Sequence, residues 1–199
     1  QLPEGAKIAP DNDTVVVAFQ TSDEIALFKL SDVPIATLTL VDLPADAGPD
    51  GLAIAPDGSF ALISNEVGDS FTFFGLPAGN VMNTYSIRDS GDVPERYNRD
   101  ARGSTKIHEP EECAIMSVAE RLYAVFALQE SHAVIAYDIT DPMAPAFEDI
   151  TEVGAGWAAE ANGRGKSDIG PEGLAARDGL ILVASEREGS LTLVQATVE

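Results

Sequence analysis

Carboxylate side chains stand near the start of four similar phrases in the sequence. The phrases are Pro3-Glu4-Gly5, Pro49-Asp50-Gly51, Pro110-Glu111-Glu112 and Pro171-Glu172-Gly173, and an apolar run follows each of them. Oxygen ligands gathered from separate segments suit hard cations, because Ca²⁺ accepts six to eight oxygens in irregular geometry. If the fold brings these phrases together, their carboxylates predict a site for Ca²⁺, with Mg²⁺ as the alternative.

A second group of polar residues follows the next apolar run of each unit, where a turn is expected. Asn65, Glu66 and Glu186 belong to this group, and they complete the set of candidate ligands. That set is Glu4, Asp50, Asn65, Glu66, Glu111, Glu112, Glu172 and Glu186. Other polar residues of the same turns are Gln20, Asp69, Gln129, Glu130 and Glu188. The alternative is structural, because a carboxylate at the start of a strand can also accept hydrogen bonds from backbone amides in a turn.

The two histidines are weaker candidates. His108 is followed by Glu109 and Glu111, a composition that a transition metal would accept. Pro110 excludes the helical spacing of a zinc-protease motif at this point. A hydrogen-bonded structural histidine is the alternative for His108, and His132 is interpreted in the same way because it lies where a turn enters a strand.

Basic residues gather in two long connections, although the chain is acidic. The first connection holds a candidate anion-binding group, since guanidinium groups meet phosphate and carboxylate oxygens with paired hydrogen bonds. The group is Arg96, Arg99, Arg102 and Lys106, and nearby basic residues are Arg88, Arg164 and Lys166. The alternative is that these residues neutralise neighbouring acids. Trp157, in the second long connection, is expected either to pack on the rim or to face a ligand.

Strand-like runs set the positions of all these side chains. In each unit, short β-branched and aromatic runs alternate with turns rich in Gly, Pro, Asp and Asn, a pattern that predicts strands. The phrases begin at residues 3, 49, 110 and 171, and repeats of this length indicate stacked supersecondary units. We therefore expect an all-β fold, a β-propeller of about four antiparallel four-stranded blades. The expected blades are 1–47, 48–108, 109–169 and 170–199 of a single domain.

In this arrangement the innermost strands, the turns after the second strands and the connections between blades share one mouth of a central channel. A weaker fourth strand is expected over 35–40, 83–87 and 146–150. The last unit has three expected strands, so the ring is incomplete or belongs to a larger propeller. Self-association, or docking with the remaining part of a larger propeller, is the predicted partnership, because unfilled blade edges are ready to pair.

Composition excludes several classes of partner. Asp and Glu number 33 against 12 Lys and Arg, giving a formal charge of −21. Such a surface repels nucleic acid and anionic lipid. Cys113 is the single cysteine and is expected to be a buried apolar residue. No signal peptide or membrane span is recognisable. No Gly-x-Ser-x-Gly elbow, phosphate-binding glycine loop or dinucleotide fingerprint is present, which argues against a serine hydrolase, a kinase and a Rossmann dehydrogenase.

Three segments resemble a known family. These are 109–142, 168–194 and 51–69, which contain Glu109-Pro-Glu-Glu-Cys-Ala-Ile, Asp168-Ile-Gly-Pro-Glu-Gly-Leu and Gly51-Leu-Ala-Ile-Ala-Pro-Asp-Gly. They resemble repeats of choice-of-anchor I domains, secreted bacterial propellers of which some are labelled alkaline phosphatases. The resemblance implies an exported protein that is extracellular, at the cell surface or periplasmic. Glu112 stands where the other phrases have glycine, and the chain is short for the family.

Two functions follow as hypotheses, and enzymatic activity stays undecided between them. The first is a secreted or cell-surface module that binds divalent cations together with a ligand or protein partner, without catalysis. The second is a metal-dependent phosphoric-ester hydrolase, alkaline phosphatase-like or phytase-like, in which a cation activates water. A single-calcium lactonase is a third possibility, for which Asn65 and Glu66 supply part of the ligand set.

Overall fold

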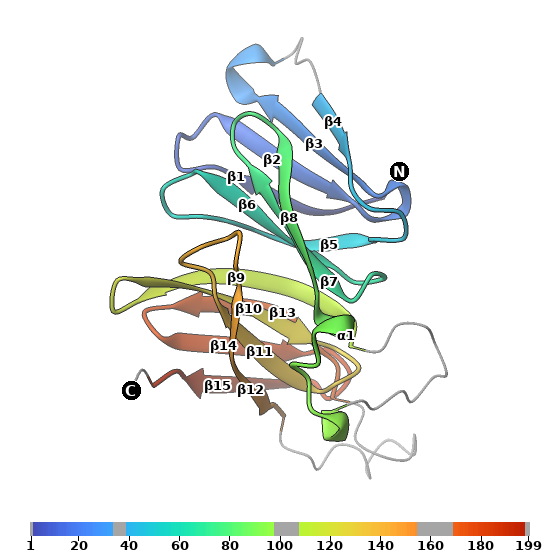
Figure 1. The fold of residues 1–199 in the computed structure, drawn as a ribbon, viewed down its shortest axis with the longest axis vertical. Helices are drawn as coiled ribbons and strands as arrows, with labels where there is room; N and C mark the ends of the chain where they lie inside the picture. The colour runs from blue at the N-terminus through green and yellow to red at the C-terminus, as the bar shows by residue number, and fades with distance from the viewer. Residues whose placement is uncertain (1, 34–38, 98–107, 155–168, 198–199) are drawn as a thin grey trace.

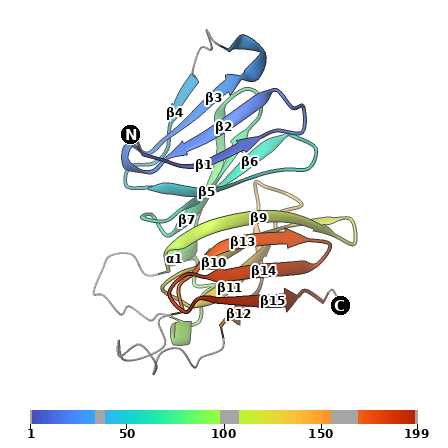
Figure 2. The same cartoon turned by 180° about the vertical axis from the view of Figure 1, so that it is seen from behind.

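The computed structural model describes residues 2–33, 39–97, 108–154 and 169–197, and its strands form four antiparallel sheets stacked one after another (Figures 1 and 2). Each sheet is a meander in which consecutive strands are neighbours. This is the arrangement of propeller blades, and the expected all-β propeller of four blades is confirmed. We call the sheets the first to fourth blade in chain order.

The strands have the following bounds. The first blade is β1 (Pro3–Ile8), β2 (Thr14–Phe19), β3 (Glu24–Lys29) and β4 (Thr39–Asp42). The second is β5 (Pro49–Ile54), β6 (Phe60–Asn65), β7 (Ser70–Gly75) and β8 (Asn80–Ser86). The third is β9 (Pro110–Val118), β10 (Arg121–Leu128), β11 (Ala133–Asp138) and β12 (Ala146–Glu152). The fourth is β13 (Pro171–Arg177), β14 (Leu180–Ser185) and β15 (Ser190–Gln195).

Helical segments are few and short in the described residues. They are the 3-10 helices η1 (Gln20–Ser22), η2 (Leu30–Asp32) and η3 (Glu95–Tyr97), and the α-helix α1 (Ile87–Ser90). The fourth strand expected over 83–87 runs instead from Asn80 to Ser86 and gives way to α1 at Ile87. The reason is local, because the Ser86 hydroxyl accepts a hydrogen bond from the Asp89 N–H and so caps a helical turn. No described helix has the length and apolar character needed to cross a bilayer.

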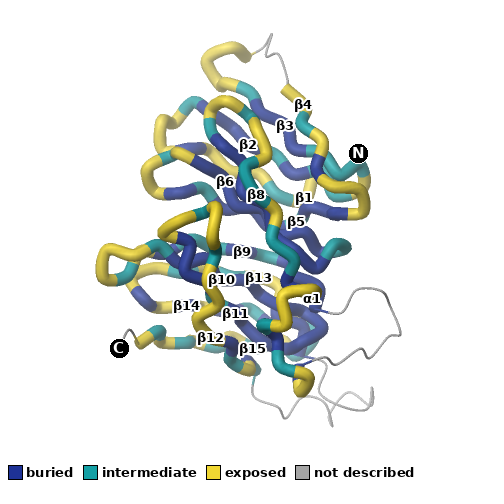
Figure 3. The backbone as a smooth tube through the Cα atoms, viewed as in Figure 1, coloured by how far each residue is buried: buried dark blue, intermediate teal, exposed yellow. Residues whose placement is uncertain are grey.

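Three apolar layers fill the spaces between successive blades, and the tube in Figure 3 is mostly buried along the second and third strands of the middle blades. The layer between the second and third blades is aromatic. Phe71 lies at its centre, with its ring stacked on Phe126 at a centroid distance of 4.7 Å and tilted against Tyr137 at 5.1 Å. Cys113 belongs to the same layer and is 3% exposed, which agrees with its expected apolar role.

Two glycines of the repeated phrase allow these blades to approach closely. A Cβ atom at Gly5 would lie 2.6 Å from the Asp50 carbonyl oxygen, and one at Gly51 would lie 2.4 Å from the Glu111 carbonyl oxygen. Real Cβ atoms do not come so near a backbone oxygen. The phrase therefore carries glycine because the inner strand of the next blade passes directly over it.

Candidate metal centre

Each strand-opening carboxylate lies where the β ladder is interrupted. The pairing register shifts between Pro3 and Gly5, between Pro49 and Leu52, and between Pro171 and Gly173. In the third blade the corresponding shift is between Phe126 and Leu128, opposite Glu111 and Glu112. An irregularity of this kind redirects side chains away from the alternation of a regular strand. The carboxylates of the four phrases thus lie at one end of the inner strands, outside the regular alternation of side chains.

These carboxylates line a single cavity of about 640 Å³ at the channel mouth. Six of the eight residues proposed from the sequence as metal ligands line it, and they come from the inner strands of all four blades and from the turn after β14. They are Glu4, Asp50, Glu111, Glu112, Glu172 and Glu186. The convergence expected from circular geometry is therefore present in the structure.

The closest grouping in the described residues is formed by Asp50, Glu66 and Glu111. One carboxylate oxygen of each lies within 4.8 Å of the others. Glu66 and Glu111 are only 8% and 9% exposed and Asp50 is half-buried, so the group is partly withdrawn from bulk water. The Gln20 amide group donates hydrogen bonds to the carboxylates of Asp50, at 3.4 Å, and Glu66. It links the first blade to this trio.

Electrostatics oppose full ionisation of the trio. Burial, followed by repulsion from Glu66 and Asp50, raises the pKa of Glu111 to about 9. Burial also raises the pKa of Asp50 to about 6, although a hydrogen bond from Glu111 acts in the opposite direction. Protonated Glu111 therefore donates to ionised Asp50 at neutral pH. A cation placed among these oxygens would replace that proton and remove the repulsion.

A second pair of acids borders the same cavity. Protonated Glu172 donates a hydrogen bond to Glu186, and this bond, followed by burial, raises the pKa of Glu172 to about 7. Glu172 and Glu186 are both exposed at the surface of the fourth blade, whereas the three carboxylates of the trio are buried or half-buried. The pair extends the negative potential of the trio toward solvent.

Two other proposed ligands make contacts of a structural kind. The Glu112 carboxylate accepts hydrogen bonds from the N–H groups of Leu52, at 3.3 Å, and Cys113, at 3.1 Å. The Asn65 side chain donates to the hydroxyls of Ser70 and Thr72 within its own blade. The Asn65 Oδ1 atom is buried and has no hydrogen-bond partner among the described residues.

Asp69 also accepts hydrogen bonds from the backbone. Its Oδ1 atom accepts hydrogen bonds from the N–H groups of His108 and Glu109, both at 2.9 Å, while Oδ2 is paired with Arg88 at 2.8 Å. The Arg88 guanidinium, one of the basic residues noted in the sequence, is thus engaged away from the trio. Its charge helps to hold the segment that leads into β9.

His108 is buried and its Nδ1 atom lies 2.8 Å from the Ser131 hydroxyl oxygen. Burial lowers the pKa of His108, so the ring is neutral at physiological pH. His132 has a positive φ of 54° in the tight turn before β11, and this position agrees with the structural interpretation of both histidines.

Of the four residues proposed to bind anions, Arg96 lies in the described part of the chain. Its guanidinium carbon is 4.8 Å from the centre of the Tyr97 ring, a cation–π contact. The other three, Arg99, Arg102 and Lys106, lie outside the described residues, as do Arg164, Lys166 and Trp157.

Sequence reasoning did not identify two serines that line the cavity. Ser185 ends β14, and its buried hydroxyl has no hydrogen-bond partner among the described residues. The Ser190 hydroxyl donates to Glu188. Neither residue has a motif around it, so their place in the cavity depends on the turn that joins β14 and β15.

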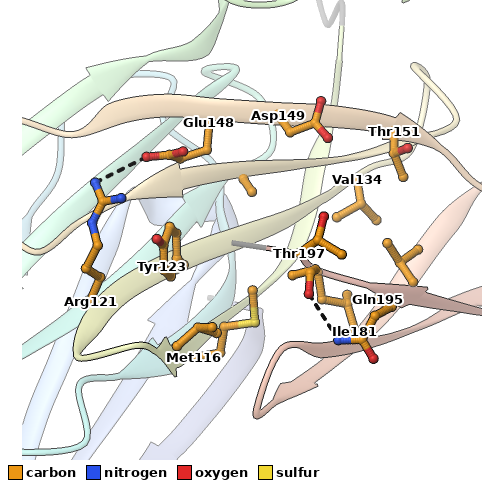
Figure 4. Close-up of a pocket in the computed structure, with 14 residues that line it drawn as sticks. Met116, Arg121, Tyr123, Val134, Glu148, Asp149, Thr151, Ile181, Gln195 and Thr197 are labelled. Atoms are coloured by element: carbon orange, nitrogen blue, oxygen red, sulfur yellow. Dashed lines mark hydrogen bonds and ion pairs between the residues drawn. The ribbon is translucent and has the colours of Figure 1, made fainter. Parts of the chain in front are cut away.

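A second cavity, of about 540 Å³, lies between the third and fourth blades at the other end of the strands (Figure 4). Its floor is apolar, with Met116, Val134 and Ile181, and Arg121 stands at its edge. The Arg121 guanidinium is paired with Asp138 and, at 3.4 Å, with Glu148. Among the described residues that line this cavity, no group of three acidic, histidine or cysteine side chains lies close together, so the channel mouth is the better candidate site.

Comparison with known proteins identifies similarity in the fold alone. No protein family matches this sequence, and no curated protein matches it. Among solved structures, virginiamycin B lyase from Staphylococcus aureus superimposes with a TM-score of 0.64 at 15% identity over 96% of this chain and 52% of that one. The periplasmic gluconolactonase of Pseudomonas aeruginosa gives 0.65 at 15% identity, over 98% and 50% of the two chains. Hydrazine synthase of Kuenenia stuttgartiensis gives 0.68 at 15%, over 97% and 46%.

The chain spans about half the length of these solved proteins. At this level of identity the likeness concerns the arrangement of the strands alone. Together with the four meander sheets, it shows that the chain is a β-propeller module whose four blades do not close a ring.

Proposed function

We propose that this chain is an exported, non-catalytic propeller module that binds a divalent cation at the channel mouth, with Asp50, Glu66 and Glu111 as the central ligands. Ca²⁺ is the preferred ion and Mg²⁺ the alternative. The module works as part of a larger propeller, through self-association or through docking with further blades, and presents the loaded mouth to a ligand or protein partner.

The observation that carries this proposal is the approach of three carboxylates to within 4.8 Å of one another at a nearly buried position. Like charges held so close are unfavourable unless a proton or a cation lies between them. Burial, followed by repulsion from Glu66 and Asp50, raises the pKa of Glu111 to about 9, so a proton lies among these carboxylates in the free protein. A divalent cation reverses it, because each carboxylate then gains an attractive partner.

Ca²⁺ suits the site better than Mg²⁺ for geometric reasons. The oxygens come from different strands and turns, and Mg²⁺ requires near-ideal octahedral geometry whereas Ca²⁺ tolerates irregular sets. Glu4 and Glu172, at the rim of the same cavity, are available as outer carboxylates. The expected export of the protein agrees with Ca²⁺, since the resemblance to choice-of-anchor I propellers supports an extracellular, cell-surface or periplasmic location.

Calorimetric titration tests the cation site. CaCl₂ and MgCl₂ are titrated separately into the chelator-treated protein and into two variants, Glu111→Gln and the matched control Glu120→Gln, whose side chain is exposed in a turn. We expect saturable Ca²⁺ binding in the wild type and the control, with at least a tenfold loss in Glu111→Gln. Equal binding in all three proteins would show that the trio is not the site.

Hydrolysis is the second candidate function, and the observation in its favour is the same group of carboxylates, since a cation held there could activate water. The substrates to test are p-nitrophenyl phosphate and phytate for the phosphoric-ester alternative and an aldonolactone for the lactonase alternative. Calcium-dependent turnover that disappears in Glu111→Gln would establish the enzyme. Absence of turnover in the calcium-loaded protein supports the binding module.

A further inference from the structure

The two end blades of the arc each present an apolar face. We propose that these faces are the two halves of one interface, and that a second copy of this chain closes the ring, the fourth blade of each copy packing on the first blade of the other. This inference rests on the ring-module part of the proposed function and does not depend on the cation.

The open face of the fourth blade matches a face that is fully covered inside the molecule. The pairs Asn65 with Ser70 and Ser185 with Ser190 occupy equivalent register positions. Leu191 and Leu193 therefore correspond to Phe71 and Phe73 of the second blade. The two phenylalanines are 0% exposed against the third blade, whereas the two leucines are 71% and 64% exposed.

Two leucines of the adjacent strand belong to the same face. Leu180 and Leu182 of β14 correspond to Phe60 and Leu62 of β6, which are 5% and 0% exposed. Both leucines are 43% exposed. The fourth blade thus has four exposed leucines at the positions where the second blade has the buried residues that pack against the third blade.

Gly173 gives independent support. At the equivalent glycines, Gly5 and Gly51, a Cβ atom would collide with the inner strand of the next blade. At Gly173 a Cβ atom would meet only the Ala184 side chain, at 3.2 Å. The fourth blade therefore keeps the glycine that close passage of another inner strand requires, although no described strand passes over it.

The first blade presents the complementary face. Ala6 and Ile8 of β1 correspond by register to Leu52 and Ile54 of β5, which pack toward the preceding blade. Leu52 is 0% exposed, but Ile8 is 57% exposed and Ala6 is also open to solvent. An inner strand with exposed apolar residues, such as β1, would cover Gly173 and the four leucines.

A second copy satisfies both faces at once. In a two-fold ring the fourth blade of one copy meets the first blade of the other, and the reverse contact forms at the same time. The ring would have eight blades, which lies within the usual range of about four to eight. The solved propellers that this chain matches are about twice its length.

Charge predicts how the association responds to salt. Each copy carries a formal charge of −21, so the two copies repel one another over long distances. Salt screens that repulsion while leaving the apolar contact in place. The dimer is therefore expected to strengthen with NaCl concentration, in contrast to an association held by ion pairs.

The test is the molar mass of the 199-residue chain in solution, measured by light scattering on a sizing column and by sedimentation velocity at low and high NaCl. We expect twice the 20.9 kDa of the monomer, with a larger dimer fraction at high salt. Leu193→Glu and Ile8→Lys should each give monomers, whereas the control Met143→Glu, at an exposed position in the turn between β11 and β12, should remain dimeric.

Mixing the two monomeric variants identifies the pairing. In the proposed ring a mixed dimer has one unsubstituted interface and one that contains both introduced charges, of opposite sign, so mixing should restore the doubled mass. If wild type is monomeric at every salt concentration, or if Ile8→Lys alone stays dimeric, the proposal is overturned. Loss of calcium binding with an intact dimer would refute the cation site and leave this interface standing.

Discussion

The Asp69 carboxylate, in the turn after β6, accepts a hydrogen bond of 2.9 Å from the backbone N–H of His108, which lies 39 residues further along the chain. The same oxygen accepts from Glu109, and the other oxygen is paired with Arg88. This buried carboxylate therefore holds the start of β9, and with it Glu111, next to the second blade. The position of the candidate ligand depends on an acid that is not itself part of the trio.

Replacing Asp69 should destabilise the protein strongly. Asp69→Ala removes the carboxylate that accepts from two buried N–H groups and pairs with Arg88, and we expect a loss of roughly 3–5 kcal/mol. Urea unfolding followed by far-UV circular dichroism measures it. Arg88→Ala, which leaves the two N–H bonds in place, should cost less. Equal stability of Asp69→Ala and wild type would contradict this role.

The stability of the cation-free protein should fall as pH rises above about 4. Because the pKa values of Glu111 and Asp50 are raised to about 9 and about 6 in the folded state, the unfolded chain loses these protons first. The folded state is therefore progressively disfavoured, through pH 6 for Asp50 and up to pH 9 for Glu111. Thermal unfolding in the presence of a chelator measures the slope.

Two comparisons isolate the source of that slope. Glu111→Gln should flatten the pH dependence between pH 6 and 9, because the group that retains its proton is gone. Saturating Ca²⁺ should raise the unfolding temperature of wild type most at high pH. When the free ion is a hundredfold above its dissociation constant, the expected gain in the free energy of unfolding is about 2.7 kcal/mol. A slope unchanged in Glu111→Gln would place its origin elsewhere.

The same substitution at two repeat positions should have unequal effects. Gly51→Ala places a Cβ atom 2.4 Å from the Glu111 carbonyl oxygen, and such overpacking should cost about 1–3 kcal/mol. Gly173→Ala meets only a side chain at 3.2 Å, so the monomer should tolerate it while association weakens. Denaturant unfolding of the two variants, with the sizing measurement above, decides both parts. Equal destabilisation would argue against close blade passage as the reason for the phrase.

Cys113 should be unreactive in the folded protein. The residue is 3% exposed, its Sγ atom lies 3.6 Å from the Leu62 carbonyl oxygen, and burial raises the pKa of the thiol well above the usual range. A thiolate is needed for attack on a disulfide reagent. Ellman's reagent should therefore label the protein only at the rate of unfolding, and rapid labelling without denaturant would contradict the packing described between the second and third blades.

The repeated phrase was sufficient to predict the propeller, because short apolar runs separated by turn residues repeat in a fixed order and each blade is built from local hairpins. It also predicted that Asp50, Glu111 and Glu172 would meet, since repeats in a ring place equivalent residues around one channel. Strand ends were less predictable. At Ser86 a local capping bond ends β8 and starts α1 one residue earlier than the strand pattern indicates.

Residue types alone could not separate the acids that face the channel from those that serve the backbone. Asp69 and Glu112 resemble Asp50 and Glu66 in sequence, but a neighbouring blade brings backbone N–H groups to the first two and other carboxylates to the second two. Tertiary structure decided this, because a carboxylate is satisfied by the donors within about 3 Å of it, and the N–H groups of His108 and Leu52 lie 39 and 60 residues away from their acceptors in the sequence. The open faces of the first and fourth blades were decided in the same way, since exposure of Leu193 or Ile8 depends on whether another blade is present.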